Sequence, residues 1–286
     1  MKVWYFVVAM LLVGCINTPV FPPQPPAPNP ILNTGIHNAV RGVFCGLIRT
    51  GTNGSNPCPG ADVDAITLSA DASACGVTVI TLLNEKCTWT NIKTTVFKIA
   101  EDLKRGDMLV FGFSGHGTQI KDEDGDEADG LDEALCLYAE LPGANIDILR
   151  DDYVMTELLM PLWKAHPGLD ILLITDTCHS QGNFRSMMNW AVPAQKHSRL
   201  LVASRATSEI DGGLIQIAMC REESYSYGYS SGGTGTQALL RARKDKIGRL
   251  ATYWMTLQYI NPEKQEPQWT EYGFVSEMFR NGEFWK

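Results

Sequence analysis

The chain has 286 residues, of which 44% are hydrophobic, and its formal net charge is -8 at pH 7. This length and apolar content suffice for one large hydrophobic core or two small ones. The acidic balance argues against a nucleic-acid-binding protein, because phosphate contacts need clustered lysine and arginine, and it suits a cationic ligand or substrate better.

The amino-terminal segment, residues 1–15, has the pattern of an export signal. Lys2 precedes an uncharged apolar run, which ends at Gly14 and Cys15 and is too short to span a membrane comfortably. The end of the run, LVGC, resembles a bacterial lipobox. This resemblance implies an exported protein that is anchored in a membrane by a lipid on Cys15; an ordinary signal peptide, giving a secreted protein, or an uncleaved anchor is the alternative.

A proline-rich stretch, PVFPPQPPAPNP, follows the signal. Such a stretch cannot pack as a helix or strand and acts as a stiff spacer. We therefore predict a linker over residues 16–35 and a folded domain over residues 36–286.

In the folded part, apolar runs alternate with segments of helical periodicity, the pattern of a parallel sheet covered on both faces. The predicted strands are residues 39–48, 76–83, 107–113, 169–175 and 199–204. The predicted helices lie within residues 88–105, 152–165, 235–242 and 246–260. The predicted fold class is α/β with a mostly parallel central sheet.

Two polar segments are predicted to be loops. Residues 121–133 form a dense acidic run that includes Asp122, Asp124 and Asp126, and residues 221–235 are rich in tyrosine and serine. The acidic run lacks the glycine and the distant glutamate of an EF-hand loop. Calcium ligation and a solvated run of charge both stay open for it.

The chain contains eight cysteines, and none is spaced as C-x-x-C. This argues against a zinc or redox site, and we expect no organic cofactor. In an exported protein, Cys58, Cys75 and Cys87 are near enough in sequence for a loop disulfide, although the spacing does not specify the pairing.

Two predicted strands end at reactive side chains. The sequence FGFSGHG leads to His116, and DILLITDTCHS leads to Cys178. Residues just beyond the carboxyl ends of parallel strands project into the crevice where ligands bind. Gly115 and Gly117 are expected to let the backbone turn sharply and to leave the imidazole exposed. If the two strands are neighbours, the imidazole and the thiol can approach each other across the crevice.

This pairing has a chemical use. A nearby imidazole lowers the pKa of a thiol or takes its proton during attack, and it later protonates the leaving amine. The backbone N–H groups of Gly117 and Cys178 are candidate donors to the oxyanion of the intermediate. In the alternative interpretation, His116 caps a strand and Cys178 is a buried, inert thiol.

The motifs together resemble the metacaspases, caspase-like cysteine peptidases. The family has SGHG, an acidic stretch, a DD pair before a helix and DSCHSG; this chain has SGHG, KDEDGDEADGLDE, Asp151 with Asp152, and DTCHSQ. The resemblance is clear over residues 36–185, a large-subunit-like part, and extends to residues 195–286, a small-subunit-like part. It implies a caspase-like αβα sandwich, with Cys178 as nucleophile and His116 as general base and acid.

The resemblance also implies cleavage after arginine or lysine, with Asp64, Ser114 and Asp176 in the pocket for the first substrate residue (S1). Carboxylates beside the nucleophile suit a guanidinium independently of the family. Asp64 is alternatively a charge on a helix surface, and Ser114 alternatively ties down the loop backbone. His179 adjoins the nucleophile but is expected to point away from it, because adjacent side chains diverge along an extended chain.

Calcium is the activator that the resemblance implies. Its ligands would be Asp132, Asp151 and Asp152, whose carboxylate oxygens this ion prefers. Arg185 stands at or near the position of a fourth ligand, where a cation would repel calcium. Gln181 and Ala61 are milder departures from the family pattern.

The expected function is therefore that of a monomeric endopeptidase that acts on proteins with basic residues and processes itself, with candidate cleavage sites at Arg221 and in RARKDK, residues 241–246. Two alternatives stay open. One is an aspartate-specific, caspase-type peptidase, and the other is a catalytically silent interaction module.

Overall fold

The computed structural model describes residues 37–51, 57–122, 130–180, 200–202, 211–221, 224–244, 248–261 and 264–286. The predicted export signal, Cys15 and the proline-rich linker lie outside these ranges. Within the described ranges, no helix is both long and apolar enough to cross a membrane.

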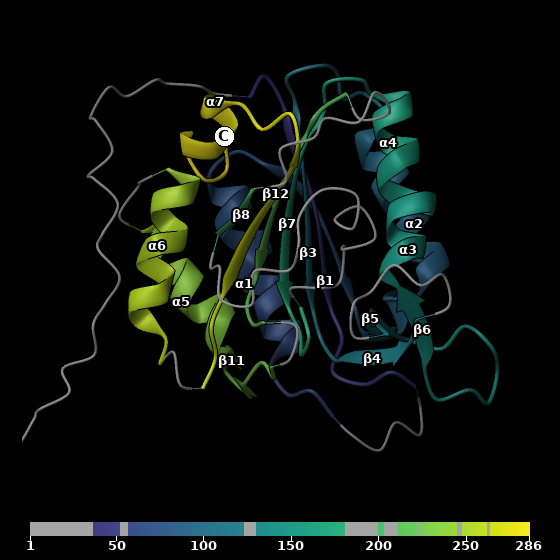
Figure 1. Cartoon of the computed structure of the whole chain (residues 1–286). Coiled ribbons are helices and arrows are strands. Elements are labelled where there is room, and N and C mark those ends of the chain that lie inside the picture. Colours follow the sequence, from purple (N-terminus) through teal and green to yellow (C-terminus); the bar gives the residue numbers. More distant parts are fainter. Residues whose placement is uncertain are drawn as a thin grey trace, which may run out of the picture. The chain divides into compact units, whose positions relative to one another are not determined.

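A seven-stranded sheet, ordered β2-β1-β3-β7-β9-β12-β8, forms the centre of the domain (Figure 1). The strands are β1 (Val40–Gly46), β2 (Thr78–Leu83), β3 (Met108–Ser114), β7 (Asp170–Asp176), β8 (Leu200–Val202), β9 (Gly213–Ala218) and β12 (Gln268–Gly273). Every neighbouring pair is parallel except β9 with β12. The prediction of a mostly parallel central sheet is confirmed.

Helices cover both faces of this sheet, which completes the predicted αβα sandwich. One face carries α1 (Ala61–Ala74), α5 (Thr234–Arg243), α6 (Arg249–Tyr259) and α7 (Glu277–Asn281). The other carries α2 (Trp89–Ala100) and a continuous helical segment of α3 (Asp151–Val154), a π-helical turn (Met155–Leu159) and α4 (Met160–Ala165). A 3-10 turn, Asn84–Lys86, joins β2 to α2. Each face has its own hydrophobic core.

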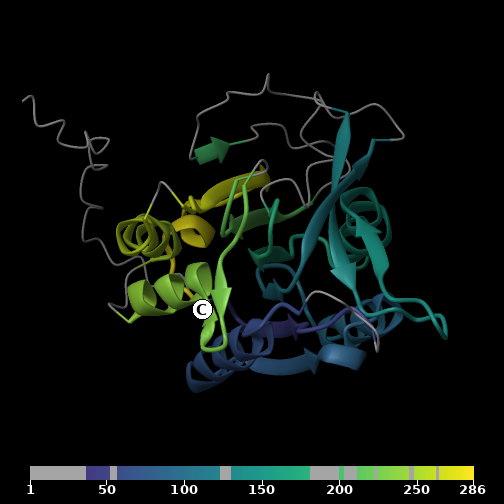
Figure 2. The same ribbon diagram turned by 90° about the horizontal axis from the view of Figure 1, so that it is seen from below.

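Two small antiparallel sheets lie beyond the carboxyl ends of the central strands, the end that faces the viewer in Figure 2. One contains β4 (Gly117–Lys121), β5 (Leu131–Leu137) and β6 (Asp147–Arg150), and the other pairs β10 (Gly228–Tyr229) with β11 (Gly232–Gly233). The predicted loops are thus partly wrong, because both ends of the acidic run belong to strands and the tyrosine-rich segment contains a hairpin. Asp124 and Asp126 lie outside the described residues.

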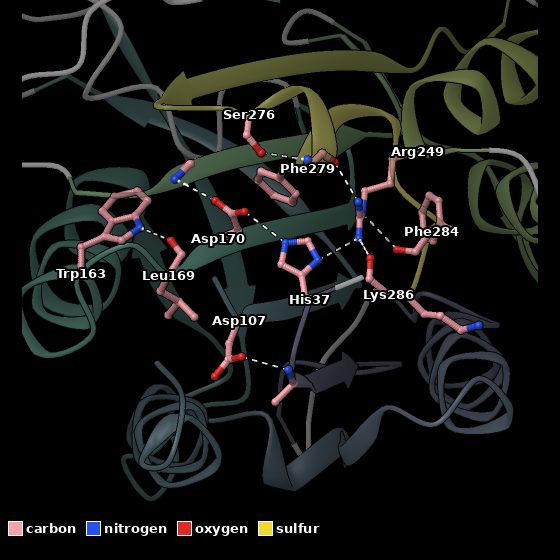
Figure 3. Close-up of polar contacts among 12 residues, drawn as sticks. His37, Asp107, Trp163, Leu169, Asp170, Arg249, Ser276, Phe279, Phe284 and Lys286 are labelled. Carbon is pink, nitrogen blue, oxygen red and sulfur yellow. Dashed lines mark hydrogen bonds and ion pairs between the residues drawn. The ribbon is translucent and has the colours of Figure 1, made fainter. Parts of the chain in front are cut away.

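A buried polar network joins the two chain ends of the domain at the amino-terminal end of β7 (Figure 3). Arg249, fully buried, donates to the backbone oxygens of Phe279 at 2.8 Å and Phe284 at 3.2 Å, and to that of Lys286. It also donates to Nδ1 of His37 at 3.4 Å, so the proton that His37 shares with Asp170 at 3.1 Å lies on Nε2.

Burial lowers the pKa of Arg249 to about 9, while Asp170 acts in the opposite direction, and the guanidinium stays charged at neutral pH. A buried charge is tolerated when its donors are satisfied, as they are by these carbonyl oxygens. The network therefore fixes the carboxyl-terminal segment against the start of the sheet.

The substitution Arg249→Met tests this network. It leaves several buried carbonyl oxygens without a donor, so we expect a loss of about 3 kcal/mol in the free energy of unfolding. The melting temperature in a thermal denaturation should fall by roughly 6–12 °C. The control, Arg105→Gln, breaks an exposed ion pair with Asp211 and should leave the melting temperature unchanged. Equal melting of Arg249→Met and the parent chain would contradict this account.

Candidate active site

The register between β3 and β7 sets the level of the reactive residues. The two strands are parallel neighbours, and Ser114 lies opposite Asp176 at their last paired position. His116 and Cys178 each follow two residues later. The strand pairing therefore delivers the imidazole and the thiol to the same end of the sheet at the same level.

Gly117 lies directly against the backbone of Cys178. A Cβ atom on Gly117 would lie 2.1 Å from the carbonyl oxygen of Cys178, a distance that no side chain tolerates. The expected sharp turn is present as a bend at Gly115, between the end of β3 and the start of β4, although neither Gly115 nor Gly117 has a positive φ. Close approach of two chain segments is what requires glycine at position 117.

One cavity of about 160 Å³ gathers the predicted residues. Its walls come from the ends of β3 and β7, from the start of α1, and from the segment that leads into α5. Six of the described residues that line it are Asp64, Ser114, His116, Asp176, Cys178 and Gly233. The structure thus brings the predicted Cys/His pair together with all three predicted S1 residues.

Asp64 is buried, with 2% of its surface exposed, although it lies in the first turn of α1. The alternative of a charge on the helix surface is therefore wrong. Its Oδ2 accepts a hydrogen bond from Oγ of Ser114 at 2.7 Å, and its Oδ1 accepts one from the N–H of Gly233 at 2.8 Å. Ser114 thus orients a carboxylate rather than the loop backbone.

Asp176 is buried beside it. Its Oδ2 accepts from both the N–H and Oγ of Thr236 at 2.8 Å, and its Oδ1 accepts from Oγ of Ser226. Two carboxylates are thus held in one cavity by hydrogen bonds, with neither aimed at the bulk solvent.

Burial and mutual repulsion penalise the charge on these carboxylates. Burial, followed by the charge of Asp176, raises the pKa of Asp64 to about 7, against the opposing hydrogen bonds from Ser114 and Gly233. Burial also raises the pKa of Asp176, against the hydrogen bonds from Ser226 and Thr236. A bound cation would remove much of this penalty.

Gly233 keeps the space between the two carboxylates clear. A Cβ atom there would lie 2.3 Å from Oδ2 of Asp176 and 2.8 Å from Oδ2 of Asp64. Its φ of -69° and ψ of 142° are accessible to any residue, so the need for glycine here is spatial. The two carboxylates and this glycine form a recess with acidic walls.

The thiol of Cys178 is half-buried and points its hydrogen toward the carbonyl oxygen of Ser226, with Sγ and O 3.9 Å apart. Burial raises the pKa of this thiol; Asp176 raises it further, and the contact with Ser226 opposes the shift. The thiol is therefore protonated at neutral pH and needs a base, and the half-buried His116 lines the same cavity.

His179 has a different setting from His116. Its ring meets the ring of Tyr225 edge-on, with 5.5 Å between the ring centroids. Its backbone N–H donates to the carbonyl oxygen of Ser224 at 3.0 Å. Its φ of 57° is uncommon for a residue other than glycine. This left-handed backbone sits directly after the candidate nucleophile, where strained conformations often occur in functional sites.

The sequence does not mark Ser226, Thr236 and Gln265 as residues of the site. Gln265 is buried; its Nε2 donates to the carbonyl oxygen of Met219 at 2.9 Å and to Oγ of Ser226 at 3.0 Å, and its Oε1 accepts from the N–H of Tyr227 at 3.2 Å. It therefore fixes the segment that contacts both Cys178 and Asp176. No motif marks these residues, because their partners are distant in sequence.

The predicted calcium ligands also come together. Asp132 of β5 and Asp151 and Asp152 of α3 each place a carboxylate oxygen within 4.8 Å of the others, and the first two are buried. This oxygen set fits a hard divalent cation. Arg150, however, donates to Oδ2 of Asp132 at 2.5 Å. The predicted departures Gln181 and Arg185 lie outside the described residues.

The cysteines that follow the linker carry free thiols in the structure, so it contains no disulfide among Cys58, Cys75 and Cys87. Cys87 instead directs its thiol to the carbonyl oxygen of Leu82 at 3.2 Å.

Comparison with known proteins agrees with this geometry. A solved structure of a protein from Geobacter sulfurreducens has a TM-score of 0.65 at 20% sequence identity and covers 87% of this chain and 98% of its own, which shows a shared fold.

Part of the sequence matches one peptidase family. Residues 69–187 match the family model described as metacaspase, peptidase C14 domain. Metacaspase-3 of Arabidopsis thaliana is 34% identical over 191 residues, which is 62% of this chain and 49% of that protein. Metacaspase-1 of the same plant is 36% identical over 91 residues, 32% of this chain and 23% of that protein. Part of this chain is therefore similar to the metacaspases, and the chain spans about half or less of these relatives' length.

The raised pKa of Asp64 predicts a pH-dependent stability difference. The folded chain holds a proton on Asp64 that the unfolded chain releases above pH 3.8, so this residue destabilises the fold as the pH rises to about 7. Asp64→Asn removes the penalised charge. Its melting temperature should exceed that of the parent chain by about 3 °C at pH 8, and the gain should shrink toward pH 4.

The matched control is Asp102→Asn, which removes an exposed carboxylate. Its melting temperature should follow that of the parent chain at every pH. A gain for Asp64→Asn that is equal at pH 4 and pH 8 would contradict the assigned charge penalty.

Proposed function

We propose that the domain is a cysteine endopeptidase that cleaves peptide bonds after arginine or lysine. The observation that supports this most is the acidic recess of Asp64, Asp176 and Gly233 in the cavity that Cys178 and His116 line. A guanidinium or an ammonium group in this recess would meet both carboxylates and relieve their repulsion.

The acidic recess disfavours the aspartate-specific alternative. Binding a substrate carboxylate would require a cationic side chain, and none of the described residues that line the cavity is a lysine or an arginine. A third carboxylate beside Asp64 and Asp176 would add to the repulsion.

In the proposed reaction, His116 takes the proton of Cys178 as the sulfur attacks the carbonyl carbon of the bond to be cleaved. The N–H groups of Gly117 and Cys178 hold the resulting oxyanion, and His116 then protonates the leaving amine. Water, deprotonated by His116, attacks the acyl group and releases the new carboxyl end and the free thiol.

The basic substrate side chain also helps to activate the thiol. The charge of Asp176 contributes to the raised pKa of Cys178. A cation bound between Asp176 and Asp64 offsets this charge, so the thiol loses its proton more readily when a basic residue occupies the recess. Recognition of the substrate is thereby coupled to the chemical step.

Fluorogenic peptides that differ only in the residue before the cleaved bond test this proposal. We expect turnover with arginine and lysine, none with aspartate, and loss of all turnover in Cys178→Ala. Cleavage after aspartate alone would refute the assigned recess. No turnover of any peptide would instead favour the catalytically silent interaction module.

The recess itself is tested by Gly233→Ala. The added methyl group enters the space between the carboxylates, so kcat/KM for the arginine peptide should fall by about 100-fold or more. The backbone angles suit alanine, and a melting temperature close to that of the parent chain would show that the loss comes from displaced carboxylates rather than from unfolding. Unchanged cleavage after arginine would show that the substrate side chain binds elsewhere.

Calcium stimulation and self-processing are further parts of the proposal. Asp132, Asp151 and Asp152 would hold the calcium ion through their carboxylate oxygens. This would stabilise the sheet that begins directly after His116. Self-cleavage at Arg221 or within residues 241–246 would be identified by amino-terminal sequencing of fragments that the Cys178→Ala variant does not produce.

We also propose that the enzyme is exported, tethered to a bacterial membrane through a lipid on Cys15, and active as a monomer on exported proteins. The apolar run and the LVGC sequence support the tether. Mass spectrometry of the mature amino terminus tests it: a diacylglyceryl-modified Cys15 is expected, and any other first residue refutes it.

A further inference from the structure

Arg150 occupies a distinctive place beside the candidate calcium ligands. It is the last residue of β6 and directly precedes Asp151 and Asp152 in the chain. In the antiparallel sheet it lies opposite Ala134 of β5, two residues beyond Asp132. The sheet thus places this arginine within hydrogen-bond distance of one of the three carboxylates, that of Asp132.

The contacts of Arg150 point into this cluster. Its Nη1 donates to Oδ2 of Asp132 at 2.5 Å and to the backbone oxygen of Lys121 at 3.3 Å. The side chain of Arg150 is 20% exposed and that of Asp132 is 2% exposed. The guanidinium therefore neutralises a buried carboxylate and links β4, β5 and β6.

A calcium ion that bound Oδ2 of Asp132 would compete with this guanidinium. Three carboxylate oxygens within 4.8 Å of one another repel unless a cation lies among them. Arg150 supplies one such positive charge. A divalent ion that used Oδ2 of Asp132 would have to displace the guanidinium, and an ion that used the other oxygens would lie beside it.

We propose that Arg150 is an internal cation that takes the place of calcium at Asp132, weakening calcium binding and holding the β4–β6 sheet in its folded arrangement without the ion. This inference rests on the proposed calcium site, and it is independent of the proposed substrate. The strand that begins at Gly117 adjoins His116, so the arginine would keep this part of the site ordered in the absence of calcium.

The test is isothermal titration of the full chain with calcium chloride, with Arg150→Gln as the variant. The glutamine removes the charge but keeps a polar side chain, so we expect calcium to bind about tenfold more tightly or better than to the parent chain. Without calcium, the variant should melt at a lower temperature than the parent chain. Calcium should raise the melting temperature of the variant to that of the parent chain.

Two further variants serve as controls. Arg105→Gln removes an exposed arginine that pairs with Asp211, and its calcium affinity should equal that of the parent chain. Adding Asp132→Asn to Arg150→Gln should abolish the gain in affinity, because the ion loses the carboxylate that the arginine had covered.

Equal calcium affinity in Arg150→Gln and the parent chain would overturn the inference. Absence of binding to both chains would overturn it together with the calcium site, while cleavage of arginine peptides would still stand on its own. If Arg150→Gln does not fold without calcium, refolding in millimolar calcium should recover it, and failure to recover would count against the inference.

Discussion

The hydrogen-bonded register between β3 and β7 is the constraint on which the site depends. Ser114 opposite Asp176 sets the level at which the two chain segments leave the sheet, and His116 and Cys178 follow at equal distance along the chain. A shift of one residue in either strand would exchange the faces on which its side chains lie and separate the pair. The long apolar strands buried on both faces fix this register, so the hydrophobic core and the proposed chemistry are set by the same pairing.

The acidic recess carries an energetic penalty, because two buried carboxylates lie close together. Asp64 and Asp176 are held in one cavity, where burial and mutual repulsion oppose their ionised forms. The fold tolerates them because Ser114, Thr236 and the N–H of Gly233 donate to their oxygens. At the opposite end of β7, the network of His37, Asp170 and Arg249 holds its buried polar groups in hydrogen bonds with one another and with backbone oxygens. The amino-terminal end of β7 thus carries a hydrogen-bonded network that stabilises the fold. The carboxyl-terminal end carries two carboxylates whose charge a bound cation would stabilise.

The sequence sufficed to predict strands, helices and the Cys/His pair where the residue types and the spacing of apolar residues indicate the same structure. The five apolar runs, the stripe of α2 and the glycine-flanked His116 predicted the parallel sheet and the Cys/His pair. It failed where burial is polar: β12 contains Gln268, Thr270 and Glu271, all of them buried, so its strand had no apolar signature. The helix α1 was missed because half of its buried residues are alanine and one is Asp64. Ser226 and Gln265 act through contacts that only the folded chain creates.

The central claim is that the imidazole of His116 activates the thiol of Cys178 in a cavity that accepts a basic side chain. A peptidyl chloromethyl ketone ending in arginine tests it directly, because peptide mapping by mass spectrometry identifies the sulfur that is alkylated. The account predicts a single label on Cys178, which His116→Ala slows by about 100-fold. A label on any other cysteine, or labelling of Cys178 at an unchanged rate in His116→Ala, would contradict it.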